Sequence, residues 1–263
     1  MDLQLRDTTA FVSGSTAGIG YAVAAALAAE GVAVTLNGRT DDRVEAAVAR
    51  LRAERPGAVV SGVAADFADP AAVARLVGRL GDVDVLVNNV GLFGLAPFGS
   101  VDDAEWQRYF EVNVMSGVRL SRALLPGMLE RGHGRVVFVS SESGVSVPAD
   151  MVHYGVTKAA VIALGNGLAK TTRGTAVTVN TVLGGPTWSD GVAATVEGIA
   201  EAQGAPVAAV RDAVIGQNAT TLVERFLDPT EIASLVAYLA SPLASATNGA
   251  ALRADGGVLT TTT

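Results

Sequence analysis

The sequence predicts an α/β protein in which helices cover both faces of one doubly wound parallel β-sheet, a three-layer α/β/α arrangement. Two observations support this fold class. Seven short apolar runs, rich in valine and alanine, alternate with helical patterns along the chain. Near-continuous apolar strands are typical of a parallel sheet that is buried on both faces. Polar clusters also follow several of these runs, at the carboxyl ends of strands, where such sheets bind ligands.

The composition narrows the class of protein. Of 263 residues, 49% are hydrophobic and 17% are charged, as expected for a chain with a large buried core. The net charge of −7, with no basic run, argues against nucleic acid as a partner. Cysteine is absent and the two histidines lie far apart, so we predict neither a disulfide nor a metal site. Without a signal-peptide pattern or an apolar run of roughly 18 residues, we expect a soluble, cytoplasmic protein with no membrane partner.

The first strand, 9–12, leads into a glycine-rich turn and then into an alanine-rich helix that ends near Glu30. In such a unit, glycines let the backbone approach a pyrophosphate, and the helix N-terminus offers free N–H groups. The spacing is G-x-x-x-G-x-G rather than the commoner G-x-G-x-x-G, and a tight turn packed on the sheet would use the same glycines. The functional interpretation predicts dinucleotide contacts at Gly14, Ser15, Thr16, Gly18, Ile19 and Gly20.

Arg39 follows the second strand, 32–36, just beyond the position 20 residues after Gly18. NAD-binding versions of this unit carry an acid there, which holds the ribose 2′-hydroxyl. An arginine instead binds a 2′-phosphate through two hydrogen bonds, so Arg39 favours NADP(H) over NAD(H). The alternative is that Arg39 is a solvated loop cation.

The next two strands also end in polar residues. A strand at 59–63 runs to Asp66 and Phe67, a helix over 70–80 follows, and a strand at 83–87 runs to the segment 88–91. Ser100 is then predicted to cap a long helix that Pro126 kinks or ends.

The fifth strand, 135–139, leads into Ser141, and a helix beyond it carries Tyr154 and Lys158. Residues four apart lie on one face of a helix, so the phenol and the ammonium should stack. A nearby ammonium favours the phenolate, and we expect it to bring the pKa of Tyr154 below about 10. Such a tyrosine exchanges protons with a substrate oxygen, which the Ser141 hydroxyl would hold. The alternative is a helix with an ordinary tyrosine and an ordinary lysine.

The remaining chain completes the same fold. After a strand at 176–180, the segment 184–217 has two short helical stretches, about 190–203 and 206–216, which suit a mobile lid over the site. Asp228 begins a helix that reaches Ala240, and a strand at 250–253 ends the sheet. With no linker and no change of composition, residues 1–263 are predicted to form a single domain.

Taken together, these motifs resemble the short-chain dehydrogenase/reductase family over nearly the whole chain. The family's signature elements occur in order: Gly14-x-x-x-Gly18-Ile19-Gly20, Asp66, Asn88-Asn89-Val90-Gly91, Asn113, Ser141, Tyr154-x-x-x-Lys158 and Asp255-Gly256-Gly257. The likeness is closest to the branch called 3-oxoacyl-carrier-protein-reductase-like, which covers many substrates. The resemblance implies a Rossmann fold and an enzyme that interconverts a carbonyl and a secondary alcohol with NADP(H), or alternatively with NAD(H).

The resemblance also implies a role for each site residue. Tyr154 would be the general acid/base, Lys158 would hold the nicotinamide ribose and lower the tyrosine pKa, and Ser141 would orient the substrate oxygen. Asn113 would keep a water that links Lys158 to solvent. The other implied cofactor contacts are Asp66, Phe67, Asn88, Gly91 and Thr187.

The sequence departs from the family pattern at two functional places. Ala17 stands where NADP-preferring members often carry a basic residue, which weakens the preference that Arg39 indicates. The segment 183–186 replaces the usual Pro-Gly, so we expect a less rigid loop under the nicotinamide. Thr187 or Ser189 either contacts the carboxamide side of that ring or caps the lid helix.

Two polar residues beside the tetrad have no family role. Glu142 is interpreted either as a contact for a cationic or hydroxylated substrate, with help from His153, or as part of a subunit contact or solvated loop. A second class of function, a nucleotide-binding sensor without turnover, is disfavoured because such proteins typically lose the tyrosine or the lysine.

Apolar residues beyond one stripe also predict self-association, as a homotetramer in line with the family resemblance. The residues concerned are Trp106, Phe110, Val114 and Val118 on one helix, and Val161, Ile162, Leu164 and Leu168 on the other.

Overall fold

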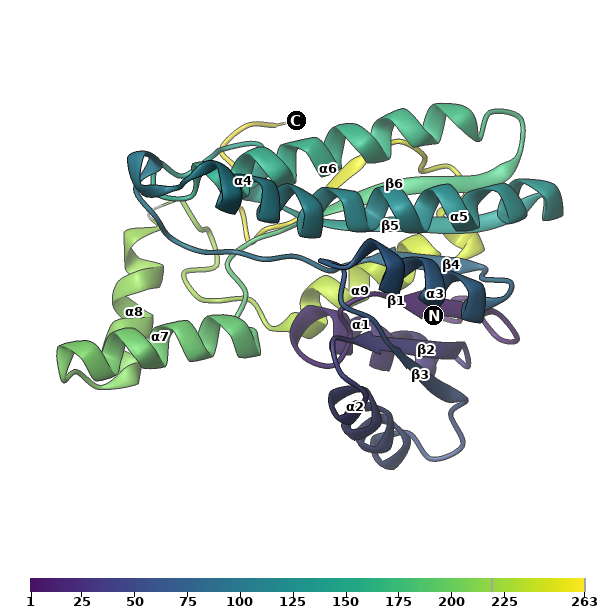
Figure 1. The fold of residues 1–263 in the computed structure, drawn as a ribbon, viewed down its shortest axis with the longest axis horizontal. Helices are drawn as coiled ribbons and strands as arrows, with labels where there is room; N and C mark the ends of the chain where they lie inside the picture. Colours follow the sequence, from purple (N-terminus) through teal and green to yellow (C-terminus); the bar gives the residue numbers. More distant parts are fainter. Residues whose placement is uncertain (219, 263) are drawn as a thin grey trace.

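The computed structural model describes residues 1–218 and 220–262, and within them seven strands form one parallel sheet (Figure 1). The strand order is β3-β2-β1-β4-β5-β6-β7, which confirms the doubly wound fold. The strands are β1 (Thr9–Val12), β2 (Ala33–Gly38), β3 (Val60–Ala64), β4 (Val85–Asn88), β5 (His133–Ser141), β6 (Ala176–Gly184) and β7 (Ala251–Ala254).

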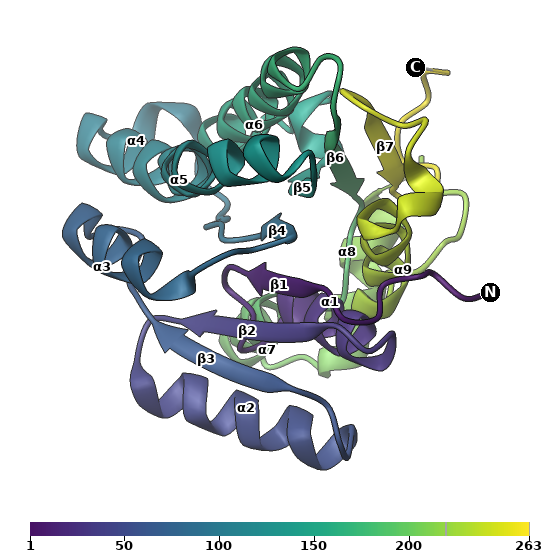
Figure 2. The same cartoon turned by 90° about the vertical axis from the view of Figure 1, so that its right-hand side faces the viewer.

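Helices cover the sheet in two layers, which Figure 2 shows with the sheet between them. The layer packed on Val12 and Val34 consists of α1 (Gly18–Ala29), α2 (Asp41–Glu54) and α9 (Pro229–Ala240). The layer packed on Phe11 and Leu86 contains α3 (Pro70–Leu80), α5 (Ser116–Arg131) and α6 (Val152–Thr171). Phe11 and Val12 thus face opposite layers, because successive side chains of a strand point to opposite faces.

The direction of winding reverses between β1 and β4. The chain builds β1, β2 and β3 outward on one side, then returns so that β4 pairs with the other edge of β1. Ser13, just beyond β1, continues this pairing through its N–H to the Val87 carbonyl at 3.0 Å. The turn after β1 and the turn after β4 therefore lie side by side, at the kind of switch point where doubly wound sheets bind ligands.

The long helix predicted from Ser100 differs from the prediction at both ends. Asp102, not Ser100, is the N-cap of α4 (Asp103–Phe110) and accepts a hydrogen bond from the Glu105 N–H at 2.8 Å. Ser100 instead closes a short 3₁₀ turn, η1 (Phe98–Ser100). After a π-helical segment, η2 (Glu111–Met115), α5 continues past Pro126 to Arg131. Buried Leu124, Leu125 and Met128 hold this stretch on the sheet, so tertiary packing outweighs the hydrogen bond that proline removes.

The predicted lid segment forms two helices, α7 (Asp190–Gln203) and α8 (Val207–Gln217). They pack on each other around Val196, Ala200 and Val210, which form a small cluster separate from the two main cores. Figure 1 shows the pair projecting from the carboxyl end of the sheet. No helix in the described residues is long and apolar enough to cross a membrane.

Candidate active site

The glycine-rich turn after β1 is held by side chains from its two neighbours. The Asn37 amide oxygen accepts from the Gly14 N–H at 3.0 Å, and the Asn89 amide donates to the Gly14 carbonyl, also at 3.0 Å. The turn is tight, because a Cβ built on Gly20 would lie 2.3 Å from the Gly14 carbonyl oxygen. Ser15 is fully buried and donates its hydroxyl to the Val12 carbonyl, so this predicted cofactor contact has its side chain turned inward.

Thr16, Arg39 and Asp66 lie on the rim of this turn. A Cβ on Gly38 would be 2.5 Å from the Thr16 methyl group, so the end of β2 passes close to the turn and places Arg39 beside it. Arg39 is exposed and makes no hydrogen bond or ion pair with any described residue. Asp66 is exposed and accepts from the Ala68 N–H at 2.9 Å. The Phe67 ring is buried in the core, so only its backbone is free to meet a ligand.

Asn88, at the end of β4, has an amide oxygen that lacks a partner. Its amide nitrogen donates to the Ser121 hydroxyl at 3.3 Å, while its buried Oδ1 has no hydrogen-bond partner among the described residues. A buried acceptor without a partner carries a free-energy cost, so this atom is a candidate contact for a ligand donor.

Ser141, Tyr154 and Lys158 come together at the end of β5. The Ser141 hydroxyl lies close enough to the Tyr154 phenol to lower its pKa. Lys158 lies one turn along α6 from Tyr154, and its Nζ is 5.6 Å from the tyrosine ring centroid. Its ammonium is buried and donates to the Val139 carbonyl at 3.1 Å. The structure therefore brings together these three of the four predicted catalytic residues.

The pKa of Tyr154 moves in the direction opposite to the prediction. Burial raises it most, and the nearby charges of Glu142 and Tyr109 raise it further, while the Ser141 hydrogen bond lowers it. Burial also lowers the pKa of Lys158 to about 8. Spacing along the helix places an ammonium near the phenol, but the loss of water around both groups, which spacing does not reveal, dominates the pKa of each. The raised pKa favours the protonated phenol, the form that donates a proton.

Asn113 lies within the π-helical segment and connects α6 to the segment after β4. Its amide oxygen accepts from the Leu92 N–H at 2.6 Å, and its amide nitrogen donates to the Leu92 carbonyl at 3.0 Å and the Thr157 hydroxyl at 2.9 Å. A Cβ on Gly91 would lie 3.4 Å from Lys158 Nζ and 3.6 Å from Asn113 Oδ1. The fourth predicted catalytic residue thus reaches the same point beside Gly91 as the ammonium.

Glu142 turns its carboxylate toward the catalytic hydroxyls. One carboxylate oxygen accepts from the Ser141 hydroxyl, and the other accepts from the Ser143 hydroxyl at 3.1 Å. His153 points elsewhere, since it is buried against the Tyr109 ring at 4.3 Å between centroids and against Trp106. Glu142 is therefore part of the site, and His153 is part of the packing of α4 against α6.

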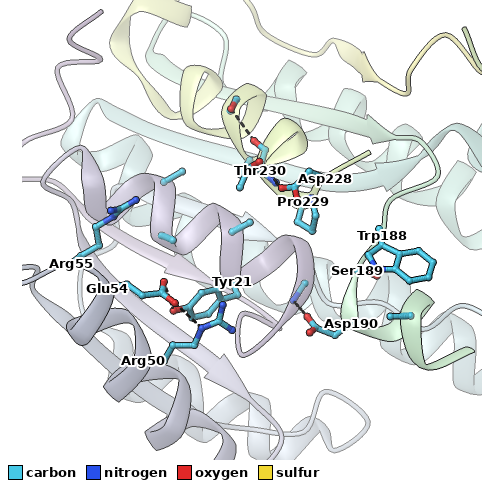
Figure 3. Close-up of a pocket in the computed structure, with 17 residues that line it drawn as sticks. Tyr21, Arg50, Glu54, Arg55, Trp188, Ser189, Asp190, Asp228, Pro229 and Thr230 are labelled. Atoms are coloured by element: carbon cyan, nitrogen blue, oxygen red, sulfur yellow. Dashed lines mark hydrogen bonds and ion pairs between the residues drawn. The ribbon is translucent and has the colours of Figure 1, made fainter. Parts of the chain in front are cut away.

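The lid touches the start of α1 through Asp190, a residue that the sequence analysis did not single out. Its carboxylate accepts from the Gly18 N–H at 2.6 Å, and Figure 3 shows it reaching from α7 toward α1. Ser189 is the N-cap of α7 and accepts from the Val192 N–H, which decides its role in favour of capping. Thr187 is buried and donates to the Gly185 carbonyl at 2.8 Å. An acid at the first turn of a lid helix is the signal that would have identified Asp190.

A cavity of about 540 Å³ opens between α1, α2, α7 and α9 (Figure 3). Tyr21, Arg50 and Glu54 line one wall, where the guanidinium lies 4.0 Å above the tyrosine ring centroid and pairs with the carboxylate. None of the four predicted catalytic residues lines this cavity.

Comparisons with known proteins agree with the fold and the motifs. A family model for short chain dehydrogenases matches residues 8–199. The uncharacterized oxidoreductase YvrD of Bacillus subtilis is 43% identical and covers 98% of this chain and 99% of its own. The 3-oxoacyl-[acyl-carrier-protein] reductase FabG of Vibrio cholerae is 32% identical over 97% of this chain and 99% of its own. The crystal structure of L-sorbose reductase from Gluconobacter frateurii, complexed with NADPH and L-sorbose, has a TM-score of 0.93 and 32% identity, and covers 99% of this chain and 100% of its own.

The buried ammonium generates a prediction about stability. Charging Lys158 costs more in the folded than in the unfolded protein, because its pKa falls from 10.5 to about 8 on folding. Stability should therefore fall as the pH drops from about 10.5 to about 8 and level off below that, with a total cost of about 3 kcal/mol.

Replacing Lys158→Met should accordingly raise the free energy of unfolding by up to about 3 kcal/mol at pH 7, and the gain should vanish near pH 10.5. Urea unfolding at both pH values measures this difference. Lys170→Met, on the exposed face of the same helix, is the control and should change little. A gain for Lys158→Met that is the same at both pH values would contradict the argument.

Proposed function

Because the chain belongs to the short-chain dehydrogenase family, we propose that this oxidoreductase interconverts a carbonyl and a secondary alcohol with NADP(H), and that Tyr154 is its general acid/base. One observation carries the proposal. The Tyr154 phenol, whose pKa burial raises, lies near the Ser141 hydroxyl and one helical turn from the Lys158 ammonium. Two neighbouring hydroxyls can bind the same substrate oxygen.

The residues around the switch point fit a dinucleotide. The turn at Gly14–Gly20 exposes the start of α1, whose N-cap position, Ala17, supplies no side-chain cap. Helix N-termini of this kind bind phosphate groups. Asn88 Oδ1 lacks a donor, and Arg39 has no partner among the described residues. An adenosine with a 2′-phosphate would give each of these groups a partner, in line with the NADPH bound to L-sorbose reductase.

The bound cofactor supplies the hydride in reduction and accepts it in oxidation. Tyr154 gives its phenolic proton to the substrate oxygen as that oxygen gains negative charge, and Ser141 donates a hydrogen bond to the same atom. Lys158 stabilises the phenolate that results, because opposite charges at this separation attract strongly in a buried site. Asn113 Oδ1 and Lys158 Nζ flank the point beside Gly91 where a water would return the proton.

Two alternatives were open from the sequence. A nucleotide sensor without turnover has no need of Tyr154 and Lys158 in contact, and the oxidoreductase relatives disfavour it. NAD(H) in place of NADP(H) stays an alternative that Arg39 argues against. The substrates of the relatives differ, since a sugar ketone and a carrier-bound 3-oxoacyl group both occur among them.

We also propose that the chain forms a homotetramer through α4, α5 and α6, which lie side by side in Figures 1 and 2. Phe110 and Val156 each expose about 40% of their surface there. Val114 and Val161, by contrast, are buried within the chain and add nothing to this face. An apolar face of this kind, in a family chain, fits closed symmetric assembly. The cytoplasmic location stays a prediction.

The first test concerns the proton. Tyr154→Phe should lower kcat by roughly 10²–10⁴-fold, the contribution of a general acid/base, while the Kd for NADP(H) changes little. Turnover with a carbonyl panel and a cofactor titration measure the two effects. Tyr238→Phe, on the exposed face of α9, is the control. Activity within a few-fold of the parent protein would rule out the role given to Tyr154.

The second test concerns the cofactor. Arg39→Ala should weaken NADP(H) binding by roughly 10- to 150-fold, the range for hydrogen bonds to a charged group, and leave NAD(H) binding unchanged. Parallel fluorescence titrations with both nucleotides provide the measurement. Arg79→Ala removes the same charge from the exposed end of α3 and serves as the control. Equal losses of affinity for NADP(H) and NAD(H) would show that Arg39 does not bind the 2′-phosphate.

The third test concerns assembly. Light scattering at micromolar concentration should give about four times the chain mass of 26.6 kDa. Phe110→Arg should lower the mass, whereas Val59→Arg, an equally drastic change on an exposed residue near β3, should not. A mass near that of one chain in the parent protein is incompatible with the proposal, and twice that mass would leave a single interface.

A further inference from the structure

Glu142 places a negative charge next to the hydroxyls that receive the substrate oxygen. Its carboxylate raises the pKa of both Tyr154 and Lys158, so its charge reaches both catalytic groups. It forms no ion pair with any described residue. It is also only partly buried, so it is accessible to a ligand. A carboxylate in this position can therefore influence which substrates bind.

The Ser141 hydroxyl is engaged by this acid. A serine hydroxyl has one hydrogen, and the Ser141 hydrogen points to a Glu142 oxygen. The Ser143 hydroxyl holds the other carboxylate oxygen at 3.1 Å, which fixes the carboxylate in this orientation. To donate to a substrate carbonyl, Ser141 must release Glu142. Release leaves the Glu142 carboxylate without the Ser141 donor, and the loss of that hydrogen bond costs free energy in a partly buried site.

A substrate that brings its own hydroxyl removes this cost. We propose that Glu142 selects substrates with a free hydroxyl on the carbon next to the reacting carbon, which are α-hydroxy ketones in reduction and vicinal diols in oxidation. The substrate hydroxyl donates to Glu142 in place of Ser141, and Ser141 then donates to the carbonyl oxygen. Ser141 and Glu142 each keep a hydrogen-bond partner through this exchange, and each hydroxyl proton stays on its own oxygen. This inference rests on the proposed function and names its substrate class.

The charges around Glu142 favour a hydroxyl over an ion. A carboxylate in the same position on the substrate would be repelled by Glu142. An ammonium would be attracted to Glu142, but it would also lie near the buried Lys158 ammonium and would lose its hydration. A hydroxyl donates to the acid without adding charge.

Four ethyl ketones test this selection, because they differ only in the group on the other side of the carbonyl. The probes are 1-hydroxy-2-butanone, 3-pentanone, 2-oxobutanoate and 1-amino-2-butanone. We expect kcat/KM for the hydroxy ketone to exceed that for 3-pentanone by about 10- to 150-fold, the range for a hydrogen bond to a charged group. The keto acid should be the poorest substrate.

Variants of Glu142 should lose the selection between the two ketones. In Glu142→Ala the ratio of kcat/KM between the hydroxy ketone and 3-pentanone should fall to within about threefold of unity. Glu142→Gln keeps an oxygen acceptor without the charge, so its ratio should be intermediate. If Glu142→Ala does not fold, the ratio measured for Glu142→Gln provides the test. The Kd for NADP(H) should stay the same in both variants, and Glu45→Gln, on the exposed face of α2, is the control.

The outcomes separate this inference from the proposed function. If both ketones turn over but their ratio is the same in the parent and in both variants, the role of Glu142 is wrong while the proposed function stands. Faster turnover of the amino ketone than of the hydroxy ketone would overturn the choice of a hydroxyl. If neither the ketones nor the corresponding alcohols react with either cofactor, the proposed function fails, and the inference fails with it.

Discussion

The site depends on how the carboxyl end of β1 is held between its neighbours. Beyond Val12 the chain leaves the sheet, and the N–H and carbonyl of Gly14 pair with side chains rather than with a neighbouring strand. Asn37 from β2 accepts from the Gly14 N–H, and Asn89 from the turn after β4 donates to the carbonyl of the same residue. These two amides satisfy buried backbone groups that would otherwise cost free energy. They hold the turn open toward the start of α1, and thus determine where an anionic ligand can bind.

Burial, more than the pairing of charges, sets the pKa values of Tyr154 and Lys158 at the end of β5. Tyr154 and Lys158 stack as residues four apart on a helix should, but the loss of water moves the pKa of the phenol up and that of the ammonium down. Both changes favour the uncharged forms. The protein keeps a destabilising lysine inside α6, and this arrangement is easier to understand as a functional requirement than as a contribution to folding.

The sequence was sufficient for the fold and for most of the local structure. Apolar runs predicted all seven strands, and Asp228 predicted the start of α9, where the structure shows a capping box with Glu231. The errors were in features that depend on packing. The helix after Ser100 begins two residues later and passes Pro126, because its buried face outweighs local preferences. The pKa of Tyr154 and the bond from Ser141 to Glu142 depend on burial and side-chain orientation, which no spacing encodes. The roles of the individual site residues stay predictions.

Asp190 accepts from the Gly18 N–H, so it would compete with the cofactor phosphate that we propose to bind at the start of α1. A tethered carboxylate is present at a high effective concentration, and it leaves only when the first turn of α7 moves away. The measured affinity of an anionic ligand is then its intrinsic affinity reduced by the fraction of molecules in which Asp190 has withdrawn. The same tether would also favour release of that cofactor, since the returning carboxylate would occupy the helix terminus as the cofactor departs. Binding and release of ligand at this point are thus tied to one motion of the lid.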